Sequence, residues 1–370
     1  MSVGLKPILV IDALTIRRGG GLVLLTNLVS SLASDSRIRV HLLCNSQVDF
    51  TAVEQLENIT IVRLAGVSSA LDAVWYRKIR LKSYLNKLAA KVTLLSFNSG
   101  LKTECPQITV HINTIPFLPW IDRAKSVGFL RSILLKRASV KALNYSVLNI
   151  FESQYLLDLA RRSFGRNISS PVVRYFGSDL PRPAVPMDYS SRINRLISVT
   201  SAANHKQNNK VVNAYLQIKD KYPDVELLFV GNEDLIRADL ARSHPELEYS
   251  GISFSGYLSR DELAEEIGKS RVLVSLSTTE SFYLVAVEAM FCGTPVVAMR
   301  IASAEESCGV YAQLIDDDFP DTVLRAYEEL NDEGAWNKYS KGGYDYSHKF
   351  QLAGCMDRIT QVIVEGIERN

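Results

Sequence analysis

One stretch, residues 271–300, limits most strongly what this chain can fold into. It reads RVLVSLSTTESFYLVAVEAMFCGTPVVAMR, with apolar runs at Val272 to Leu276 and Val296 to Met299 on either side of a short apolar helix. Gly293 and Pro295, directly after that helix, are typical of a helix end. The two runs are too apolar to alternate, which is typical of parallel strands covered by helices on both faces. The stretch therefore predicts a strand–loop–helix–strand unit of a parallel α/β sheet.

Two glutamates bracket the start of the predicted helix. Glu280 lies in the loop after the first strand, and Glu288 lies about a turn and a half inside the helix. Backbone amides of Tyr283, Leu284 and Val285 would point toward an anion such as a diphosphate. An ionised carboxylate accepts hydroxyl donors, so one suits a sugar and the other a ribose diol. Since open α/β sheets bind ligands at this edge, the spacing predicts a nucleotide-sugar site.

Strands and helices alternate along the rest of the chain. In the first half we expect a helix at 22–32 and strands at 7–11, 40–44, 59–64, 92–97, 107–112 and 147–151. In the second half we expect strands at 195–199, 226–230 and 252–255 and helices at 210–222, 260–268, 321–331 and 350–368. This alternation predicts doubly wound parallel sheets. The proline-rich residues 180–186 are typical of a boundary between two domains.

Charge separates the two halves of the chain. Residues 1–180 hold 23 Lys and Arg against 11 Asp and Glu, whereas residues 181–370 hold 19 against 29. The basic half is the candidate for an anionic partner, a membrane or a lipid pyrophosphate, and the aromatic pattern of a nucleic-acid groove is not evident. The sequence shows no membrane-spanning run and no signal-peptide pattern. Five scattered cysteines without a Cys/His cluster predict a reduced, cytosolic protein without a structural metal.

The segment around the two glutamates resembles the Glu-x7-Glu signature of retaining glycosyltransferases of the GT-B, family-4 type. Those enzymes commonly read E-G-F-G-L-x-x-x-E-A-M-A-x-G-x-P-V-V, and this chain has E-S-F-Y-L from Glu280 and E-A-M-F-C-G from Glu288. Tyr283 replaces a common glycine, a change expected to crowd the donor pocket or alter the choice of sugar. The resemblance implies an α/β GT-B fold of two doubly wound Rossmann-like domains that face each other across a cleft. Residues 1–180, completed by helix 350–370, would be the acceptor side, and residues 181–349 would bind the donor.

The same resemblance implies further residues of the donor site. Lys206, in the loop after strand 195–199, matches the family's donor-phosphate lysine, and a lysine there can reach a phosphate as a point charge. Thr200 and Ser201 stand where the family often has an arginine. The full predicted donor-binding set is Gly20, Gly21, Thr200, Ser201, Lys206, Gly231, Asn232, Tyr257, Leu258, Glu280, Ser281, Phe282, Tyr283, Leu284, Val285 and Glu288.

The first half contributes a glycine triplet and a histidine as candidates. Gly19, Gly20 and Gly21 would let backbone amides approach the donor phosphates, although a flexible turn is the alternative. They do not form the G-x-G-x-x-G fingerprint, which disfavours NAD. His111, at a strand end, matches a family histidine beside the transferred sugar, with a buried core histidine as the alternative.

Basic amphipathic segments suggest contact with a membrane. Residues 75–88 place cations and apolar side chains at helical spacing, and residues 123–141 contain six more cations. An ordinary surface helix is the alternative. The predicted acceptor or membrane side consists of Arg17, Arg18, Trp75, Arg77 and Lys78.

The resemblance implies transfer of a hexosyl or deoxyhexosyl group from a GDP-, UDP- or dTDP-sugar, with retention at the anomeric carbon. Glu280, Lys206 and His111 would be the catalytic residues, without a metal or other cofactor. The acceptor would be a saccharide, carried on a lipid, in the synthesis of a bacterial surface polysaccharide such as O-antigen, lipopolysaccharide or capsule. The enzyme would be cytoplasmic, at the inner face of the inner membrane.

Three other functions remain open from the sequence. A glycoside hydrolase could use Glu280 and Glu288 as its pair of carboxylates. A sugar-nucleotide-binding protein without catalysis would need the same donor site. A sugar-nucleotide epimerase on the same fold would differ only in its product.

Overall fold

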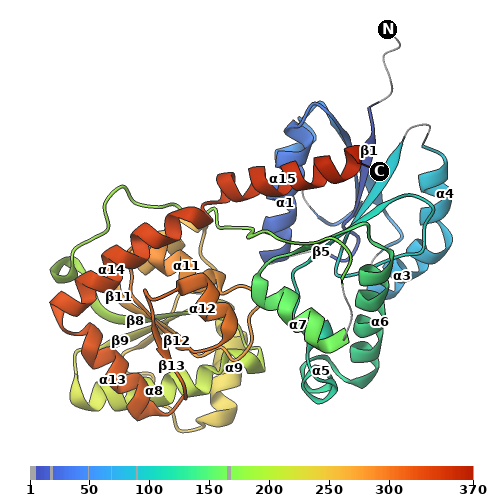
Figure 1. Cartoon of the computed structure of the whole chain (residues 1–370). Coiled ribbons are helices and arrows are strands. Elements are labelled where there is room, and N and C mark those ends of the chain that lie inside the picture. The colour runs from blue at the N-terminus through green and yellow to red at the C-terminus, as the bar shows by residue number, and fades with distance from the viewer. Residues whose placement is uncertain are drawn as a thin grey trace. The chain divides into compact units, whose positions relative to one another are not determined.

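The computed structural model describes residues 6–16, 20–48, 50–67, 69–88, 91–164 and 168–369. The chain divides into two compact units, each with its own sheet (Figure 1). Unit 1 comprises Met1–Phe176 and Ala353–Asn370, and unit 2 comprises Gly177–Leu352. The first break lies four residues before the predicted one, and the chain returns to unit 1 three residues later than predicted.

The described residues of unit 1 form seven parallel strands in the order β3-β2-β1-β4-β5-β6-β7. The strands are β1 (Ile8–Asp12), β2 (Arg39–Asn45), β3 (Ile59–Leu64), β4 (Val92–Phe97), β5 (Gln107–His111), β6 (Leu148–Phe151) and β7 (Pro171–Val173). The sequence predicted the first six. It missed β7 because this edge strand has only three residues, all half-buried, and begins with a proline.

Helices connect most of the successive strands of unit 1. They are α1 (Gly20–Ser34), α2 (Thr51–Glu54), α3 (Ala70–Ile79), α4 (Leu81–Asn86), α5 (Trp120–Val127), α6 (Phe129–Tyr145), α7 (Gln154–Phe164) and α15 (Leu352–Glu368). The basic stretch 75–88 is thus divided between α3 and α4, and the stretch 123–141 between α5 and α6. Gly128, with φ +83°, separates the latter two helices. Helix α15 lies beside α1 (Figure 1), where Ser31 Oγ and Thr360 Oγ1 are 2.7 Å apart.

Unit 2 has six parallel strands in the order β10-β9-β8-β11-β12-β13. They are β8 (Ile193–Val199), β9 (Glu226–Val230), β10 (Ile252–Phe254), β11 (Ser270–Ser275), β12 (Val296–Met299) and β13 (Gln313–Ile315). The helices are α8 (Asn208–Lys221), α9 (Glu233–Ser243), α10 (Arg260–Lys269), α11 (Leu284–Phe291), α12 (Ala302–Cys308), α13 (Pro320–Leu330) and α14 (Glu333–Ser347). The sequence did not predict β13, α9, α12 or α14.

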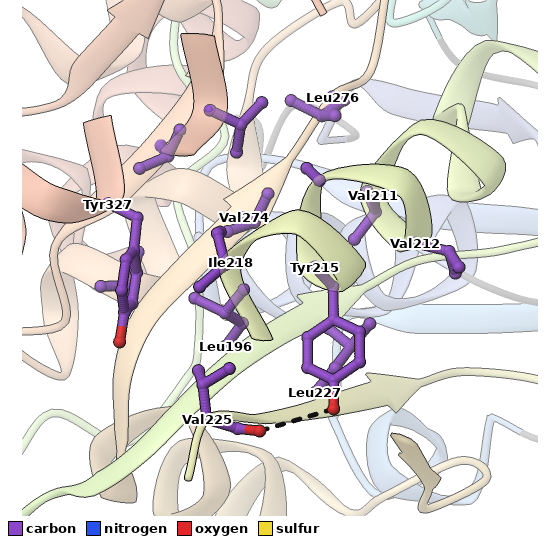
Figure 2. Packing of buried hydrophobic residues seen from close by; sticks show 14 of the residues in the cluster. Leu196, Val211, Val212, Tyr215, Ile218, Val225, Leu227, Val274, Leu276 and Tyr327 are labelled. Carbon is purple, nitrogen blue, oxygen red and sulfur yellow. Dashed lines mark hydrogen bonds between the residues drawn. The ribbon is translucent and has the colours of Figure 1, made fainter. Parts of the chain in front are cut away.

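A large apolar core holds the sheet of unit 2 against its helices. Leu196 and Leu227 from neighbouring strands, Tyr215 of α8 and Tyr327 of α13 belong to one cluster (Figure 2). Each of these side chains is at most 1% exposed. Burial of one such side chain contributes about 1.5–3 kcal/mol, so the cluster holds the strand ends in fixed positions.

Both units are therefore doubly wound parallel α/β sheets, as predicted. In each sheet the strand order reverses between two central neighbours, β1 and β4 in unit 1 and β8 and β11 in unit 2. Such a reversal leaves a crevice at the carboxyl edge of the sheet, where ligands bind. Within the described part of the chain, every helix is too short or too polar to cross a bilayer.

Candidate functional site

The two loops at the strand reversal of unit 2 bring the predicted lysine and glutamate together. The first loop follows β8, the second follows β11, and the Thr278 amide donates to the His205 carbonyl at 2.9 Å between them. Lys206 Nζ lies 2.7 Å from Glu280 Oε1. The two side chains are 19% and 17% exposed, so solvent reaches both but surrounds neither. The sheet thus joins groups that lie 74 residues apart in the sequence.

This ion pair can take part in the binding of an anion. An ammonium group has three N–H donors, so Lys206 can hold Glu280 and still donate to a phosphate oxygen. The carboxylate of Glu280 has acceptor sites beyond the one that Lys206 occupies. The pair therefore offers a cation for a diphosphate and an acceptor for hydroxyl groups within one crevice.

Glu288, the second predicted carboxylate, is 5% exposed and already has two donors. Ser178 Oγ donates to its Oε1 at 2.7 Å, and Arg260 Nη2 donates to the same oxygen at 2.7 Å. Arg260 Nη2 also pairs with Asp179 Oδ1 at 2.7 Å. Both hydrogen bonds end on Oε1, so neither donor occupies Oε2, and its contact with a ribose hydroxyl stays a prediction.

Sequence reasoning missed Arg260, Ser178 and Asp179. One signal in the sequence could have shown the arginine's role. Arg260 is the first residue of α10, after the capping residue Ser259. The helix dipole disfavours a cation at that position, so an arginine there needs acidic partners.

Tyr283 does not crowd a donor pocket, which corrects the expectation from the sequence. Its side chain is fully buried, and its hydroxyl donates to the Ser275 carbonyl oxygen at 2.7 Å, back along β11. Burial raises the pKa of the Tyr283 hydroxyl. The amide of Leu284, one of three predicted to face an anion, donates to the Phe282 carbonyl at 2.7 Å. The amides of Tyr283 and Val285 stay the predicted donors.

Three neighbouring strands end together beside this pair of loops. The Thr200 amide donates to the Val230 carbonyl at 2.9 Å, and the Gly231 amide donates to the Gly256 carbonyl at 3.0 Å. Gly231 has φ +148°, and a Cβ atom there would lie 2.2 Å from the Thr200 carbonyl oxygen. Only glycine therefore lets the ends of β8 and β9 approach this closely.

Several predicted donor residues of unit 2 already have structural partners. Thr200 Oγ1 donates to Asn208 Oδ1 at 2.7 Å, and Asn232 Oδ1 caps α9 by accepting from the Leu235 amide at 3.0 Å. Phe282 is buried. By contrast, Ser201 and Tyr257 are exposed, and Ser281, Leu258 and Val285 are half-buried. The role of each in donor binding stays a prediction.

His111 lies in the core of unit 1, which matches the alternative given for it above. It is fully buried, its Nε2 is 3.0 Å from Asn149 Oδ1, and its ring stacks on Phe151 with 4.5 Å between centroids. Burial lowers the pKa of His111 to about 4. This position offers no exposed atom to a sugar and counts against the predicted catalytic role.

The buried His111 should make the stability of unit 1 depend on pH. Because its pKa is about 4 in the folded state and 6.5 when unfolded, only the unfolded chain gains a proton between these values. Stability is therefore lost as the pH falls from 6.5 toward 4, by about 2 kcal/mol at pH 5. In urea unfolding at pH 8 and pH 5, His111→Phe should shrink the difference between the two pH values by this amount. An unchanged difference would contradict the assignment.

The remaining candidates of unit 1 have mixed outcomes. Gly20 and Gly21 are the first two residues of α1, so they lie in a helical turn and not in a loop. Arg77 was predicted to face an acceptor or membrane, which is wrong. Its Nε and Nη2 pair with Asp12 Oδ2 and Oδ1 at 2.6 and 2.9 Å, and the Asp12 side chain is fully buried. Trp75 and Lys78 are exposed.

Three other predicted residues, Arg17, Arg18 and Gly19, lie outside the described residues. In the described ranges, no three His, Cys, Asp or Glu side chains converge in a way that could hold a metal ion. The five cysteines are all free thiols.

Comparison with known sequences finds a family match within unit 2. Residues 194–332 match the family described as glycosyl transferases group 1. An uncharacterized glycosyltransferase of Methanocaldococcus jannaschii is 32% identical over 119 residues, which are 31% of this chain and 34% of that protein. The match thus spans about a third of the length of this curated relative.

Solved structures resemble the whole chain. Sucrose-phosphate synthase from Thermosynechococcus elongatus matches 99% of this chain and 100% of its own, with a TM-score of 0.78 and 16% identity. HepE from Anabaena, solved in complex with UDP-glucose, matches 97% of this chain and 99% of its own, with a TM-score of 0.66 and 18% identity. These identities show the fold alone, which is the α/β GT-B fold of two Rossmann-like units.

Proposed function

We propose that this chain, whose residues 194–332 match the family described as glycosyl transferases group 1, transfers a sugar from a nucleotide diphosphate donor. The contact between Lys206 Nζ and Glu280 Oε1, 2.7 Å at the strand reversal inside the matched segment, carries this proposal. The complexes of HepE with UDP and with UDP-glucose support a nucleotide sugar as the donor.

In the proposed reaction, the bond between the anomeric carbon and the diphosphate oxygen breaks, the acceptor oxygen forms the new glycosidic bond, and the acceptor's proton passes to the departing diphosphate. Lys206 stabilises the negative charge on the departing diphosphate, together with the amides at the start of α11. Preorganised donors of this kind act without a reorganisation cost in a partly shielded crevice. Glu280 accepts hydrogen bonds from the sugar, and Glu288 accepts them from the ribose through Oε2.

The finer features follow the family resemblance. We propose retention at the anomeric carbon, a hexosyl or deoxyhexosyl group, and no requirement for a metal. The acceptor is a lipid-linked saccharide of a bacterial surface polysaccharide, and the enzyme works at the cytoplasmic face of the membrane. The excess of cations in residues 1–180 supports an anionic acceptor or surface.

A glycoside hydrolase is the weaker reading of the same two glutamates. Glu288 is 5% exposed and accepts hydrogen bonds from Ser178 and Arg260. With Oε1 engaged by both donors and the side chain nearly enclosed, little of this carboxylate is open to a glycosidic bond. Release of aryl alcohol from a simple aryl glycoside, without a nucleotide sugar, would favour the hydrolase.

Thermal unfolding with UDP, GDP, dTDP and their sugars tests the donor site directly. A ligand that binds only the native state raises the apparent melting temperature, so one nucleoside diphosphate should stand out. Glu288→Ala should lose most of the shift that this diphosphate causes. Glu280→Ala should keep that shift and lose the further increase that the attached sugar gives.

Glu305→Ala is the matched control, because Glu305 is a 54% exposed glutamate whose ion pair with Arg300 spans 3.5 Å. Ligand should raise the melting temperature of Glu305→Ala as much as it raises that of the wild type. The melting temperature of each variant without ligand separates a loss of binding from a loss of stability. Equal ligand shifts in the wild type and both site variants would rule out the assigned site.

A further inference from the structure

An exposed apolar surface lies on two neighbouring helices of unit 1, α5 and α6. Figure 1 shows these helices together at one end of unit 1, and they pack against each other. Five large apolar side chains there are between 49% and 75% exposed: Trp120, Ile121, Phe129, Leu130 and Leu134. We call these five residues the α5–α6 tip. Water contact at so many neighbouring apolar side chains is unfavourable, so the tip requires a partner.

The exposed face of α6 changes from apolar to basic along the helix. Leu130, Leu134, Arg137 and Lys141 follow one another at spacings of four, three and four residues, and all four are exposed. Residues at these spacings share one helix face. At 1.5 Å per residue, Arg137 lies about 10 Å along the axis from Leu130.

This gradient has the dimensions of a helix end inserted into a bilayer surface. Interfacial helices bury their apolar side chains about 5–10 Å into the boundary between headgroups and acyl chains. With Leu130 at that depth, Arg137 and Lys141 would lie at the level of the lipid phosphates. Trp120 at the start of α5 has the amphipathic ring that favours the interface.

Charge favours an anionic lipid surface over a second copy of the chain. Residues 120–145 contain six Lys and Arg and one acidic residue, Asp122. In a symmetric dimer the same patch would face itself and bring like charges together. Anionic headgroups instead attract each cation near the surface.

We propose that the α5–α6 tip inserts into an anionic membrane surface and is the main membrane anchor of this protein. This proposal rests on the proposed function, which includes membrane contact, and it names the helices that make that contact. Helix α3, which carries the predicted Trp75 and Lys78, then contributes less to membrane binding than the tip does. Binding to vesicles requires neither donor nor acceptor, so a negative result here would leave sugar transfer untouched.

Flotation of the full chain with vesicles of one part phosphatidylglycerol to two parts phosphatidylcholine tests the proposal. The wild type should float, and Leu130→Ser with Leu134→Ser should lower its partition coefficient at least about tenfold. Arg137→Gln with Lys141→Gln should weaken binding to these vesicles by about tenfold and leave binding to pure phosphatidylcholine unchanged. All four side chains are exposed, so the variants should fold normally.

The matched control is Val74→Ser with Ile79→Ser on α3, where the two side chains are 45% and 58% exposed. This variant should float nearly as well as the wild type. In Trp75→Phe, Trp120 is the exposed tryptophan that remains, since Trp336 is 1% exposed. The fluorescence emission of Trp120 should move to shorter wavelength when vesicles are added. A larger loss in the α3 variant would overturn the assignment to the tip. A wild-type protein that does not float with the vesicles would also overturn the proposal. In that case, dimers that Leu130→Ser with Leu134→Ser disrupts would identify the tip as a contact between two copies of the chain.

Discussion

Lys206→Met is expected to lower the turnover number of sugar transfer by about 10²–10³-fold, the usual loss when one preorganised donor to a developing anion is removed. Lys206 is the cation that the structure places at the strand reversal of unit 2, 2.7 Å from Glu280. Methionine keeps most of the side chain's length and apolar stem, so the loss isolates the charge. The measurement is the rate of nucleoside diphosphate release with the donor identified by thermal unfolding.

Two further variants separate the charge at this site from general electrostatics. Lys210→Met removes a 36% exposed lysine of α8 whose ion pair with Asp318 spans 3.6 Å, and its rate should stay within about twofold of the wild type. Glu280→Gln in the Lys206→Met background removes the unpaired carboxylate. The double variant should recover the melting temperature that Lys206→Met loses, and its rate of sugar transfer should stay low. Wild-type turnover in Lys206→Met would refute the role of the lysine as the diphosphate cation.

The second large effect concerns Arg192, which holds the end of the helix that carries Glu288. Arg192 is 4% exposed, and its guanidinium lies 4.7 Å from the centre of the Trp336 ring. It donates five hydrogen bonds of 2.6 to 3.1 Å, to carbonyl oxygens of Met187, Ser270, Cys292 and Gly293 and to Thr294 Oγ1. Cys292 and Gly293 directly follow α11, so one side chain satisfies the carbonyls at its C-terminal end.

Arg192→Leu is expected to lower the free energy of unfolding of unit 2 by about 3–5 kcal/mol, because it leaves several buried carbonyls without donors. Urea unfolding followed by Trp336 fluorescence measures this, in a Trp75→Phe, Trp120→Phe background. Trp336 belongs to unit 2 and the other two tryptophans to unit 1, so the signal reports on unit 2 alone.

Arg325→Leu is the control for the loss of an arginine. Arg325 is exposed and donates one hydrogen bond, of 3.2 Å, to Thr322. Its replacement should change the free energy of unfolding by at most about 0.5 kcal/mol. Equal urea midpoints for Arg192→Leu and Arg325→Leu would contradict the proposed role of Arg192.

Local pattern was enough for most of the strands and for the meeting of Lys206 with Glu280. Apolar runs of four to six residues, bounded by glycine and proline, predicted β4 and β9 to the residue. The strands of a doubly wound sheet all end at one edge. Polar residues that directly follow neighbouring strands must therefore come together, whatever their distance along the chain.

The short or half-buried elements were not predictable in this way. Strands β7 and β13 have three residues each and begin with a proline and a glutamine, so only two adjacent aliphatic residues mark each of them. Their pairing depends on the neighbouring strand that offers hydrogen bonds. The division of residues 123–141 at Gly128 likewise depends on a backbone angle, φ +83°, that the sequence permits and does not require.

The chain's sequence thus predicted the two α/β units and most of the strand ends, and it named Lys206, Glu280 and Glu288 as candidates for donor binding. It could not establish which side chains point at a ligand. His111, Arg77 and Tyr283 all looked available, yet tertiary packing places His111 and Tyr283 in cores and pairs Arg77 with Asp12. The same packing gives Glu288 its partners, Ser178 and Arg260. Side-chain direction depends on contacts made across the fold, and a one-dimensional pattern records only which strand or helix a residue belongs to.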